Sequence, residues 1–290
     1  MQNTNQNRNF KDTVFVDLFG KCPEAKANFL SLYNAIHGTN LTLSESKIEP
    51  IMLEQTVYRG LYNDVSMLLD GKIIVLVEQQ STVNENMPLR FLEYISRIYE
   101  KLISKDERYK VRMISLPKPE FYVFYNGIAD YPAEKTLKLS DAFFIQDKNH
   151  QKSENYVLEL SVKVYNMNKK KDNSFIEKSS SLSGYSKIVE YDRKAKKAGI
   201  EDHLDFAIQR CIKEGIVSDY LIKNSTEVRN MLIAEYDYDT DIRVQRQESF
   251  EEGAAKQKAE DEKLILALNA QKNAEIQYLK EEIERLKSKK

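Results

Sequence analysis

Apolar residues return along the first half of the chain with two different periods, which predict two kinds of element. Over 25–36 they recur every three or four residues, as on the buried side of an amphipathic helix, and the pattern stops before Gly38. The next apolar runs are short, β-branched or aromatic, and divided by turn residues such as those of Asp70-Gly71. These runs predict four strands, over 51–59, 64–69, 73–80 and 121–125.

A helix over 88–104 is predicted between the third and fourth of these strands. Pro88 suits its first position, where a missing N–H group costs nothing. The apolar residues that follow at helical spacing are expected to form its buried stripe, and they are Leu92, Ile95, Tyr99 and Leu102. Strands joined by a crossing helix indicate a mixed α/β core.

The second half of the chain is predicted to be mostly helical. A strand over 156–165 precedes a lysine-rich loop and amphipathic helices over 182–234. From about 248 onward the chain is rich in Ala, Glu and Lys, and it carries the 3-4-3 spacing of a coiled-coil seam at Ile276, Leu279, Ile283 and Leu286. Extending this register backward places Asn269 and Lys272 in the seam, so we expect a short self-associating or frayed tail helix and not a long rod.

These patterns divide the chain into four parts. We expect a disordered arm over 1–9, an α/β core over 10–165, a basic loop and helical region over 166–247, and a charged helical tail over 248–290. The seam in the tail predicts a homodimer formed through the C-terminal helices.

The composition excludes several classes of protein. The 290 residues are 41% hydrophobic and 31% charged, which is typical of a globular chain. The longest strongly apolar stretch, 73–77, is far shorter than the roughly 20 residues that a membrane span needs. The N-terminus is polar and predicts no signal peptide. We therefore expect no membrane partner.

Cysteine and histidine are too scarce to support the commonest kinds of metal or nucleophilic site. Cys22 and Cys211 lie far apart, which predicts neither a zinc site nor a disulfide framework and favours a reducing, cytoplasmic location. His37, His150 and His203 are widely separated, which weakens any histidine-centred catalytic proposal. Chemistry in this chain is therefore expected to rest on carboxylates.

The charge is balanced in total but not along the chain. The 44 Lys and Arg against 45 Asp and Glu give a net charge of −1, which by itself does not indicate a nucleic-acid partner. The segment 165–199, however, is strongly basic and includes Lys169, Lys170 and Lys171. Such a segment can attract DNA, although a lysine-rich loop is more often a solvated surface.

The most informative stretch is 63–80, in which a hairpin can bring two carboxylates together. Strand alternation places Glu78 and Gln80 on one face. A two-residue turn would point Asp64 away from Glu78, whereas a three-residue loop, Asp70-Gly71-Lys72, would place Asp64 opposite Glu78. The second register also collects the apolar residues of both strands on one surface, with Asp64, Ser66, Glu78 and Gln80 on the other.

Two opposed carboxylates are unfavourable unless a proton or a cation lies between them. Oxygen ligands without a nearby His or Cys favour Mg²⁺ or Mn²⁺, which can polarise a phosphodiester and activate water. Gln80 is placed to orient the attacking water, but its neutral amide cannot supply the positive charge of a lysine. The alternative interpretation is that Asp64 and Glu78 are ordinary solvated residues at strand ends.

A string of motifs around this hairpin matches a known family in order. Asn63-Asp64 opens one strand, Glu78-x-Gln80 closes the next, Ser81-Thr82 follows, and Met87-Pro88-Leu89-Arg90 begins a helix that contains Tyr94. Residues 62–102 thereby resemble the PD-(D/E)XK nuclease family transposases, also called recombination-promoting nucleases (Rpn). Weaker similarity extends the resemblance over about 10–245, through segments such as Leu32-Tyr33-Asn34 and Tyr125-Asn126-Gly127.

The resemblance implies a restriction-endonuclease-like fold, with a mixed sheet flanked by helices, and metal-dependent DNA cleavage in recombination or phage defence. By that resemblance Asp64 and Glu78 would bind the metal, and Gln80 would occupy the place of the catalytic lysine. Asp12 would be a supporting acidic residue. Gln79 stands where relatives often carry histidine.

Other polar residues are candidates for contact with DNA. The predicted helix 88–104 carries a polar face that would position phosphates, made by Arg90, Tyr94, Arg97 and Lys101. The same face can equally be solvated and laced by neighbouring charges. The aromatic run 121–125 is expected to belong to the core and not to stack on bases.

Two functions of different classes are thus compatible with the sequence. The first is a metal-dependent DNA endonuclease that uses Asp64, Glu78 and Gln80 with Mg²⁺ or Mn²⁺. The second is a non-catalytic DNA- or protein-interaction protein that works through its C-terminal helices and coiled-coil tail.

Overall fold

The computed structural model describes residues 13–51, 65–144, 156–169 and 174–287. It divides the chain into two compact units, with the boundary between Glu235 and Tyr236. The first unit contains a sheet and the helices around it, and the second is helical.

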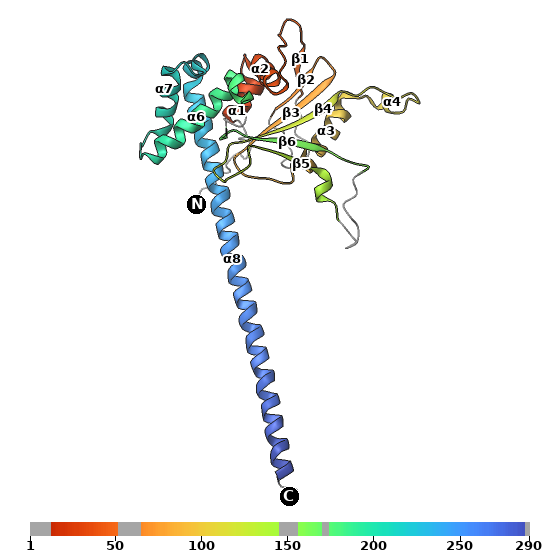
Figure 1. Cartoon of the computed structure of the whole chain (residues 1–290), viewed down its shortest axis with the longest axis vertical. Coiled ribbons are helices and arrows are strands. Elements are labelled where there is room, and N and C mark those ends of the chain that lie inside the picture. The colour runs from red at the N-terminus through yellow and green to blue at the C-terminus, as the bar shows by residue number, and fades with distance from the viewer. Residues whose placement is uncertain (1–12, 52–64, 145–155, 170–173, 288–290) are drawn as a thin grey trace, which may run out of the picture. The chain divides into compact units, whose positions relative to one another are not determined.

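The first unit is built on a six-stranded mixed sheet (Figure 1). Its strands are Ile48–Pro50 (β1), Val65–Leu69 (β2), Ile73–Gln80 (β3), Lys118–Tyr125 (β4), Glu134–Lys138 (β5) and Ser161–Asn166 (β6). They lie in the order β1-β2-β3-β4-β6-β5. Strands β3, β4 and β6 are parallel, while the pairs β1–β2, β2–β3 and β5–β6 are antiparallel. This arrangement confirms the predicted mixed α/β class.

The β2–β3 hairpin has the three-residue connection that the sequence favoured. Leu69 pairs with Ile73 and Val65 with Val77, so Asp70, Gly71 and Lys72 form the loop. Asp70 and Gly71 both have positive φ angles, of 51° and 66°, a conformation that glycine and aspartate tolerate better than most residues. The register is therefore the one from which Asp64 was placed opposite Glu78, although Asp64 itself lies outside the described residues.

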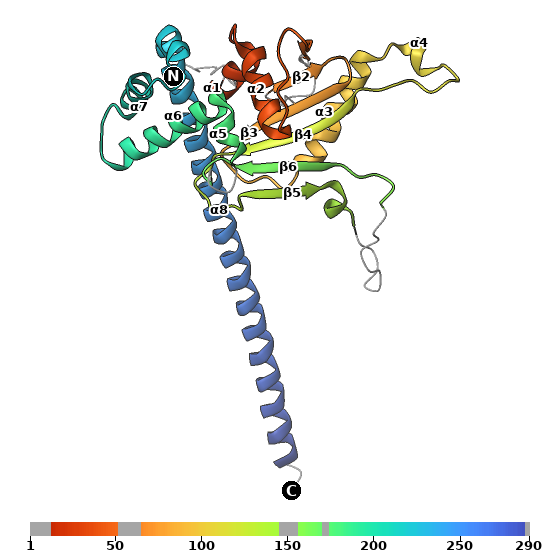
Figure 2. The same ribbon diagram turned by 45° about the horizontal axis from the view of Figure 1, so that its top comes forward.

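Helices cover both faces of the sheet (Figure 2). In chain order they are Val14–Val16 (α1), Ala25–His37 (α2), Met87–Leu102 (α3), Lys105–Arg108 (α4), Phe175–Lys178 (α5), Ser180–Lys197 (α6), His203–Lys213 (α7) and Ser218–Lys287 (α8). A π-helical turn, Asp17–Lys21, follows α1, and a 3₁₀ turn, Leu139–Ala142, follows β5.

One face of the sheet packs against helices from both ends of the first unit. Its buried side chains include Val65, Met67, Val75 and Val77, which join residues of α1, α2, α6, α7 and the first turns of α8 in one cluster. Helices after residue 166 therefore share a core with the sheet, because their apolar stripes and those of α1 and α2 cover the same strands.

The opposite face packs against α3. Ile74, Leu76 and Val123 of the sheet meet the buried side of this helix. The buried stripe of α3 is centred on Phe91, Tyr94, Ile95 and Ile98. The predicted stripe is confirmed for Ile95, partly confirmed for Leu92 and Tyr99, and wrong for Leu102. The side of α3 that carries Phe91, Tyr94 and Ile98 faces the strands. Leu92 and Tyr99 therefore lie at the edge of the contact, and Leu102 is exposed.

Several strand predictions are corrected in their boundaries. Of the strand predicted over 51–59, only Ile51 lies within the described part of the chain, and it follows β1 without belonging to it. The sequence did not predict β1 itself. The strand predicted over 156–165 is shorter, as β6, and pairs with β5, which the sequence did not predict. The aromatic run 121–125 is buried within β4, with alternate side chains on the two faces, as predicted.

The second unit consists of the continuation of α8. This helix is 70 residues long, with non-helical angles only at Asn224, and its first turns bury Leu221, Val228 and Leu232 in the core of the first unit. The expected short tail helix is therefore wrong, because a proline-free segment rich in Ala, Glu and Lys propagates a helix without interruption. Among the helices that the structure describes, none is both long and apolar enough to cross a membrane.

Candidate active site

Polar residues gather where the parallel strands end. Strands β3, β4 and β6 run in the same direction, so their carboxyl ends meet at one edge of the sheet. Gln80 ends β3, Asn126 follows β4, and Asn166 ends β6. In sheets of this kind ligands bind outside the carboxyl ends of the strands, which makes this edge the candidate site.

Glu78 is the one carboxylate of the predicted pair that the structure describes. It lies near the end of β3, is only 2% exposed, and points to the face that α3 covers, beside Val123 of β4. The Nη2 atom of Arg90 lies 3.2 Å from Oε1 and 3.2 Å from Oε2 of Glu78. A buried carboxylate in this setting needs a positive partner, and α3 supplies it.

Tyr94 joins this pair from one turn further along α3. Its hydroxyl accepts hydrogen bonds from Nη2 and Nε of Arg90, at 2.8 and 3.3 Å. Residues four apart lie on the same side of a helix, which explains how Arg90 and Tyr94 both reach Glu78. Burial raises the pKa of Tyr94 well above its usual value, and the charge of Glu78 raises it further. The phenol therefore remains protonated at neutral pH.

The burial of Tyr94 corrects one part of the predicted polar face of α3. Its ring is fully buried and packs edge-on against Phe91, with ring centres 5.9 Å apart. Arg97 is half-buried and Lys101 is exposed. Tyr94 thus holds Arg90 from inside the protein, and the solvent-facing part of this set consists of basic residues alone.

Gln80 is anchored by a methionine at the start of α3. Its Nε2 atom lies 2.6 Å from Sδ of Met87, a fully buried residue, and Nη1 of Arg90 lies 3.7 Å from the same sulfur. The half-buried Gln80 and Arg90 therefore share a neighbour. Pro88, in the first turn, sets the direction in which α3 leaves the site.

Asn126 holds the ends of β3 and β4 together on the opposite face of the sheet. It is 4% exposed, accepts a hydrogen bond from Nε2 of Gln79 at 2.8 Å, and donates one to the hydroxyl of Tyr185 in α6 at 3.0 Å. Its carbonyl oxygen accepts a hydrogen bond from Arg193. The sequence predicted only a strand end and turn here. An asparagine directly after an apolar strand is the local signal for a polar group at this edge, but the sequence does not reveal its partners.

Gly127 follows Asn126 because no side chain fits at that position. A Cβ atom there would lie 2.0 Å from the carbonyl oxygen of Ser81 and 2.4 Å from the hydroxyl of Tyr125. The loops that leave β3 and β4 therefore approach each other more closely than any other residue would permit. This contact fixes the backbone just beyond Gln80.

The donor set of the site is suited to a hard cation but is only partly within the described chain. Glu78 supplies two carboxylate oxygens and Gln80 an amide oxygen, which is the ligand chemistry of Mg²⁺ and Mn²⁺. Among the residues described, no three His, Cys, Asp or Glu side chains form a group that could hold a metal. Asp64 and Asp12, the other predicted acidic residues, lie outside that part of the chain.

The lysines predicted to contact DNA are only partly described. Lys169 follows β6 at the same edge of the sheet, and its Nζ lies 3.1 Å from Oδ1 of Asp130. Lys170 and Lys171 lie outside the described residues.

Both histidines that the structure describes, His37 and His203, have carboxylate partners, although no histidine-centred catalysis was expected. Nε2 of His37 lies 2.9 Å from Glu120 and 3.1 Å from the hydroxyl of Tyr122. Nδ1 of His203 lies 2.6 Å from Asp192. Glu120 of β4 lies beside Val75 of β3, three residues before Glu78. Because side chains alternate along a strand, Glu120 points to the face of the sheet opposite Glu78. The His37 cluster is thus separate from the candidate site.

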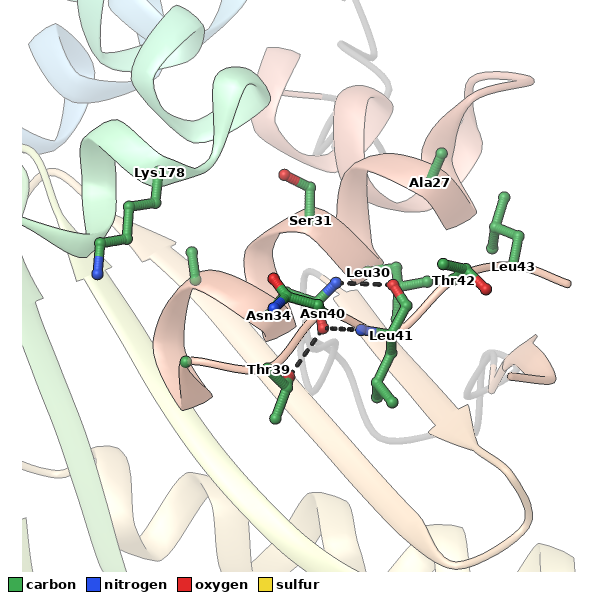
Figure 3. A pocket seen from close by; sticks show the side chains of 12 residues that line it. Ala27, Leu30, Ser31, Asn34, Thr39, Asn40, Leu41, Thr42, Leu43 and Lys178 are labelled. Atoms are coloured by element: carbon green, nitrogen blue, oxygen red, sulfur yellow. Dashed lines mark hydrogen bonds between the residues drawn. The ribbon is translucent and has the colours of Figure 1, made fainter. Parts of the chain in front are cut away.

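A hollow in the described surface also lies away from Glu78. It has a volume of about 490 Å³ and is lined by α2, the 38–43 loop and Lys178 (Figure 3). Asn34 shapes it, since its amide binds both backbone groups of Leu41 and the hydroxyl of Thr39. Within the Leu32-Tyr33-Asn34 segment, Asn34 therefore holds the 38–43 loop in place.

Comparison with known proteins identifies a family over most of the first unit. Residues 54–210 match the family model described as "Putative transposase, YhgA-like". The matched segment contains the hairpin, α3 and the strand ends that form the candidate site. No curated protein and no solved structure matches the chain.

Proposed function

Because the chain belongs to the YhgA-like transposase family, within the PD-(D/E)XK and Rpn-like group, we propose that it is a divalent-metal-dependent DNA endonuclease. The observation that carries the proposal is the buried Glu78 at the carboxyl end of β3, held by Arg90 next to Gln80. Ligands of mixed α/β proteins bind outside the carboxyl ends of parallel strands, and this buried ion pair lies at such an edge.

In this proposal Glu78 and Asp64 bind Mg²⁺ or Mn²⁺. When bound, the metal supplies a Lewis acid for the phosphodiester and a more acidic water. Gln80, anchored through its nitrogen to Met87, orients the attacking water through its amide oxygen. Asp12 supports the acidic group.

Arg90 and Tyr94 have different roles in the same proposal. Arg90 is the positive group closest to Glu78 and neutralises charge on the phosphate. Tyr94 is a positioning residue, because its hydroxyl fixes the guanidinium of Arg90 from the protein interior. Arg90 thereby partly replaces the positive charge that a lysine in place of Gln80 would provide.

DNA binding would be dominated by contacts to the phosphate backbone. Arg97 and Lys101 extend the basic side of α3 beyond Arg90, and three consecutive lysines, Lys169, Lys170 and Lys171, follow β6. Contacts of this kind carry little sequence information and weaken as salt concentration rises. The proposal therefore does not include a sequence preference.

The test is cleavage of supercoiled plasmid in Mg²⁺, Mn²⁺ and Ca²⁺ by the full chain and by Glu78→Gln. We expect wild-type nicking in Mg²⁺ or Mn²⁺ and a loss of at least about 100-fold in the variant, as for removal of a key transition-state group. Glu93→Gln, an exposed position on α3, is the matched control and should cleave normally. Equal cleavage by Glu78→Gln and wild type would overturn the assignment.

The second candidate is a non-catalytic DNA- or protein-interaction protein. It is favoured by the neutral Gln80 and by the engagement of Glu78 with Arg90. Calorimetric titration of the full chain with Mn²⁺ distinguishes the two, because the nuclease requires binding that Glu78→Gln abolishes. Absence of metal binding together with absence of cleavage would support this candidate.

A further inference from the structure

The helical second unit leaves large apolar side chains in water. Over 236–287 the backbone is helical throughout, and its exposed apolar residues include Leu264, Ile265, Leu266, Leu268, Ile276 and Leu279. Ile265 and Leu268 are 57% and 56% exposed. Exposed apolar residues that cluster on one helix mark a surface for association.

The last two heptads define where the contact runs. With Ile276 at position a, Leu279 falls at d, Ile283 at a and Leu286 at d. Isoleucine at a combined with leucine at d favours two parallel strands over larger assemblies. The identity of the seam residues therefore already favours a pair of helices.

The seam before these two heptads contains an asparagine, which affects how the two chains align. Ile265 falls at d, Asn269 at a and Lys272 at d. A single asparagine at an a position lowers the stability of a coiled coil but specifies its register, because the two asparagines pair across the seam. Asn269 thus weakens the apolar pattern and at the same time aligns the two chains.

Charges beside the seam distinguish a parallel pair from an antiparallel one. Glu275 and Glu282 occupy g positions, while Lys280 and Lys287 occupy e positions. In a parallel pair each g residue meets the e residue of the next heptad on the other chain, so Glu275 meets Lys280 and Glu282 meets Lys287. In an antiparallel pair g meets g and e meets e, which would oppose like charges.

We propose that residues 262–287 form a parallel, in-register, two-stranded coiled coil with a second copy of this chain. The outer side of the last two heptads carries polar residues. Its Gln277 and Glu281, at b and f, are joined by a hydrogen bond of 3.1 Å. The proposal does not depend on nuclease activity, and its tests measure association alone.

The first test is the mass of the full chain by sedimentation equilibrium over a range of concentrations. We expect a dimer for wild type, a monomer for Leu279→Lys at a d position, and a dimer for Ala270→Lys at an outer b position. Both substituted residues are exposed in the single chain, so the fold of the first unit should be retained, and its far-UV circular dichroism checks this. A monomeric wild type, or a dimeric Leu279→Lys, would overturn the proposal.

The second test measures orientation and register by oxidation. Asn269→Cys should give a disulfide-linked dimer under mild oxidant, because a residues face each other in a parallel pair. Ala270→Cys should not, and the buried Cys22 and Cys211 make wild type a suitable baseline. A dimer that fails to cross-link at position 269 would contradict the parallel register.

The third test uses the charges. A chain carrying Glu275→Lys and Glu282→Lys places lysine at both e and g, and one carrying Lys280→Glu and Lys287→Glu places glutamate at both. Each chain alone should be monomeric, and a mixture should form a heterodimer. Homodimers of either charge-changed chain as stable as wild type would show that these pairs do not direct the assembly.

Discussion

The Nη2 atom of Arg90 lies 3.2 Å from each carboxylate oxygen of Glu78, although one residue is on α3 and the other is on β3. Glu78 is buried, whereas the Arg90 side chain is 27% exposed. The hydroxyl of Tyr94, 2.8 Å from the same nitrogen, holds the guanidinium in place. The stability of the carboxylate in the core therefore depends on how α3 packs over the face of β3 that carries Glu78.

Removal of Arg90 should destabilise the fold through this buried charge. Truncating one partner of a buried ion pair costs roughly 3–5 kcal/mol. Because Arg90 is partly exposed, we expect Arg90→Ala to lower the free energy of unfolding by about 2–3 kcal/mol in urea denaturation. Arg112→Ala, at an exposed loop position, should change it by less than about 0.5 kcal/mol.

A double-mutant cycle separates the charge from other effects of the substitution. In a Glu78→Gln background no carboxylate remains to be left unpaired, so Arg90→Ala should cost distinctly less there than in wild type. Equal costs in the two backgrounds would mean that the Arg90–Glu78 contact does not stabilise the protein.

Asn126 is expected to be as important to the fold as any apolar residue of comparable burial. Asn126→Ala removes the hydrogen bonds that a buried side chain makes to Gln79 and Tyr185. At roughly 0.5–1.5 kcal/mol for each lost bond, we expect a loss of about 2 kcal/mol in the free energy of unfolding, measured by urea denaturation. Asn40→Ala, at an exposed position, is the control. A loss of the same size in both variants would argue against the network.

Features that depend on neighbouring residues could be predicted from the sequence, whereas features that depend on distant parts of the chain could not. The β2–β3 register could be predicted, because the alternation of apolar residues and the Asp70-Gly71 turn are local. The facing of Glu78 away from the main apolar surface was predicted for the same reason. Its burial was not, because that depends on α3 packing over this face.

The hydrogen-bond network of Asn126 could not be predicted for the same reason. Gln79, Asn126 and Tyr185 come from three elements, and only the sheet order and the position of α6 bring them together. The stripe of α3 was displaced by part of a turn for a related reason. Helical periodicity gives the spacing of buried residues, but the partner surface decides which of two adjacent rows is covered.

Glycine at 127 should be irreplaceable, in contrast to glycine at 253. Gly127→Ala would place a methyl group against the backbone of Ser81, which cannot move without shifting the end of β3. We expect a strongly lowered melting temperature or no folded protein. A Cβ at Gly253, within α8, meets nothing within 4 Å. Gly253→Ala should therefore stabilise the helix by about 0.5–1 kcal/mol, the difference in helix propensity between glycine and alanine. Thermal unfolding followed by circular dichroism compares the two, and normal stability of Gly127→Ala would contradict the close approach.

Buried tyrosines should make the fold sensitive to alkaline pH. Burial raises the pKa of Tyr165 to about 12, with a further contribution from the charge of Glu134. Desolvation also raises the pKa values of three other tyrosines, by more than that of Tyr165, and these are the buried Tyr94 and Tyr122 and the half-buried Tyr220. Ionisation of any of them places an anion where water is largely excluded.

The sign of the pH dependence follows from which state binds the proton more tightly. The folded protein keeps the Tyr165 proton up to about pH 12, whereas the unfolded chain releases it near pH 10. The stabilisation is therefore complete below about pH 10 and is lost as the pH rises to about 12, by roughly 2–3 kcal/mol for this residue. Tyr165→Phe keeps the ring that contacts Phe124 and Phe175 but removes this contribution.

Urea denaturation from about pH 9 to about pH 11.5 measures the effect, over the range in which the unfolded chain ionises first. The free energy of unfolding of wild type should fall with pH, and that of Tyr165→Phe should fall less steeply. Tyr109→Phe is the matched control, because Tyr109 is 78% exposed, and its slope should equal that of wild type. If Tyr165→Phe and wild type lost stability in parallel, the proton on Tyr165 would have no part in holding the sheet against α5.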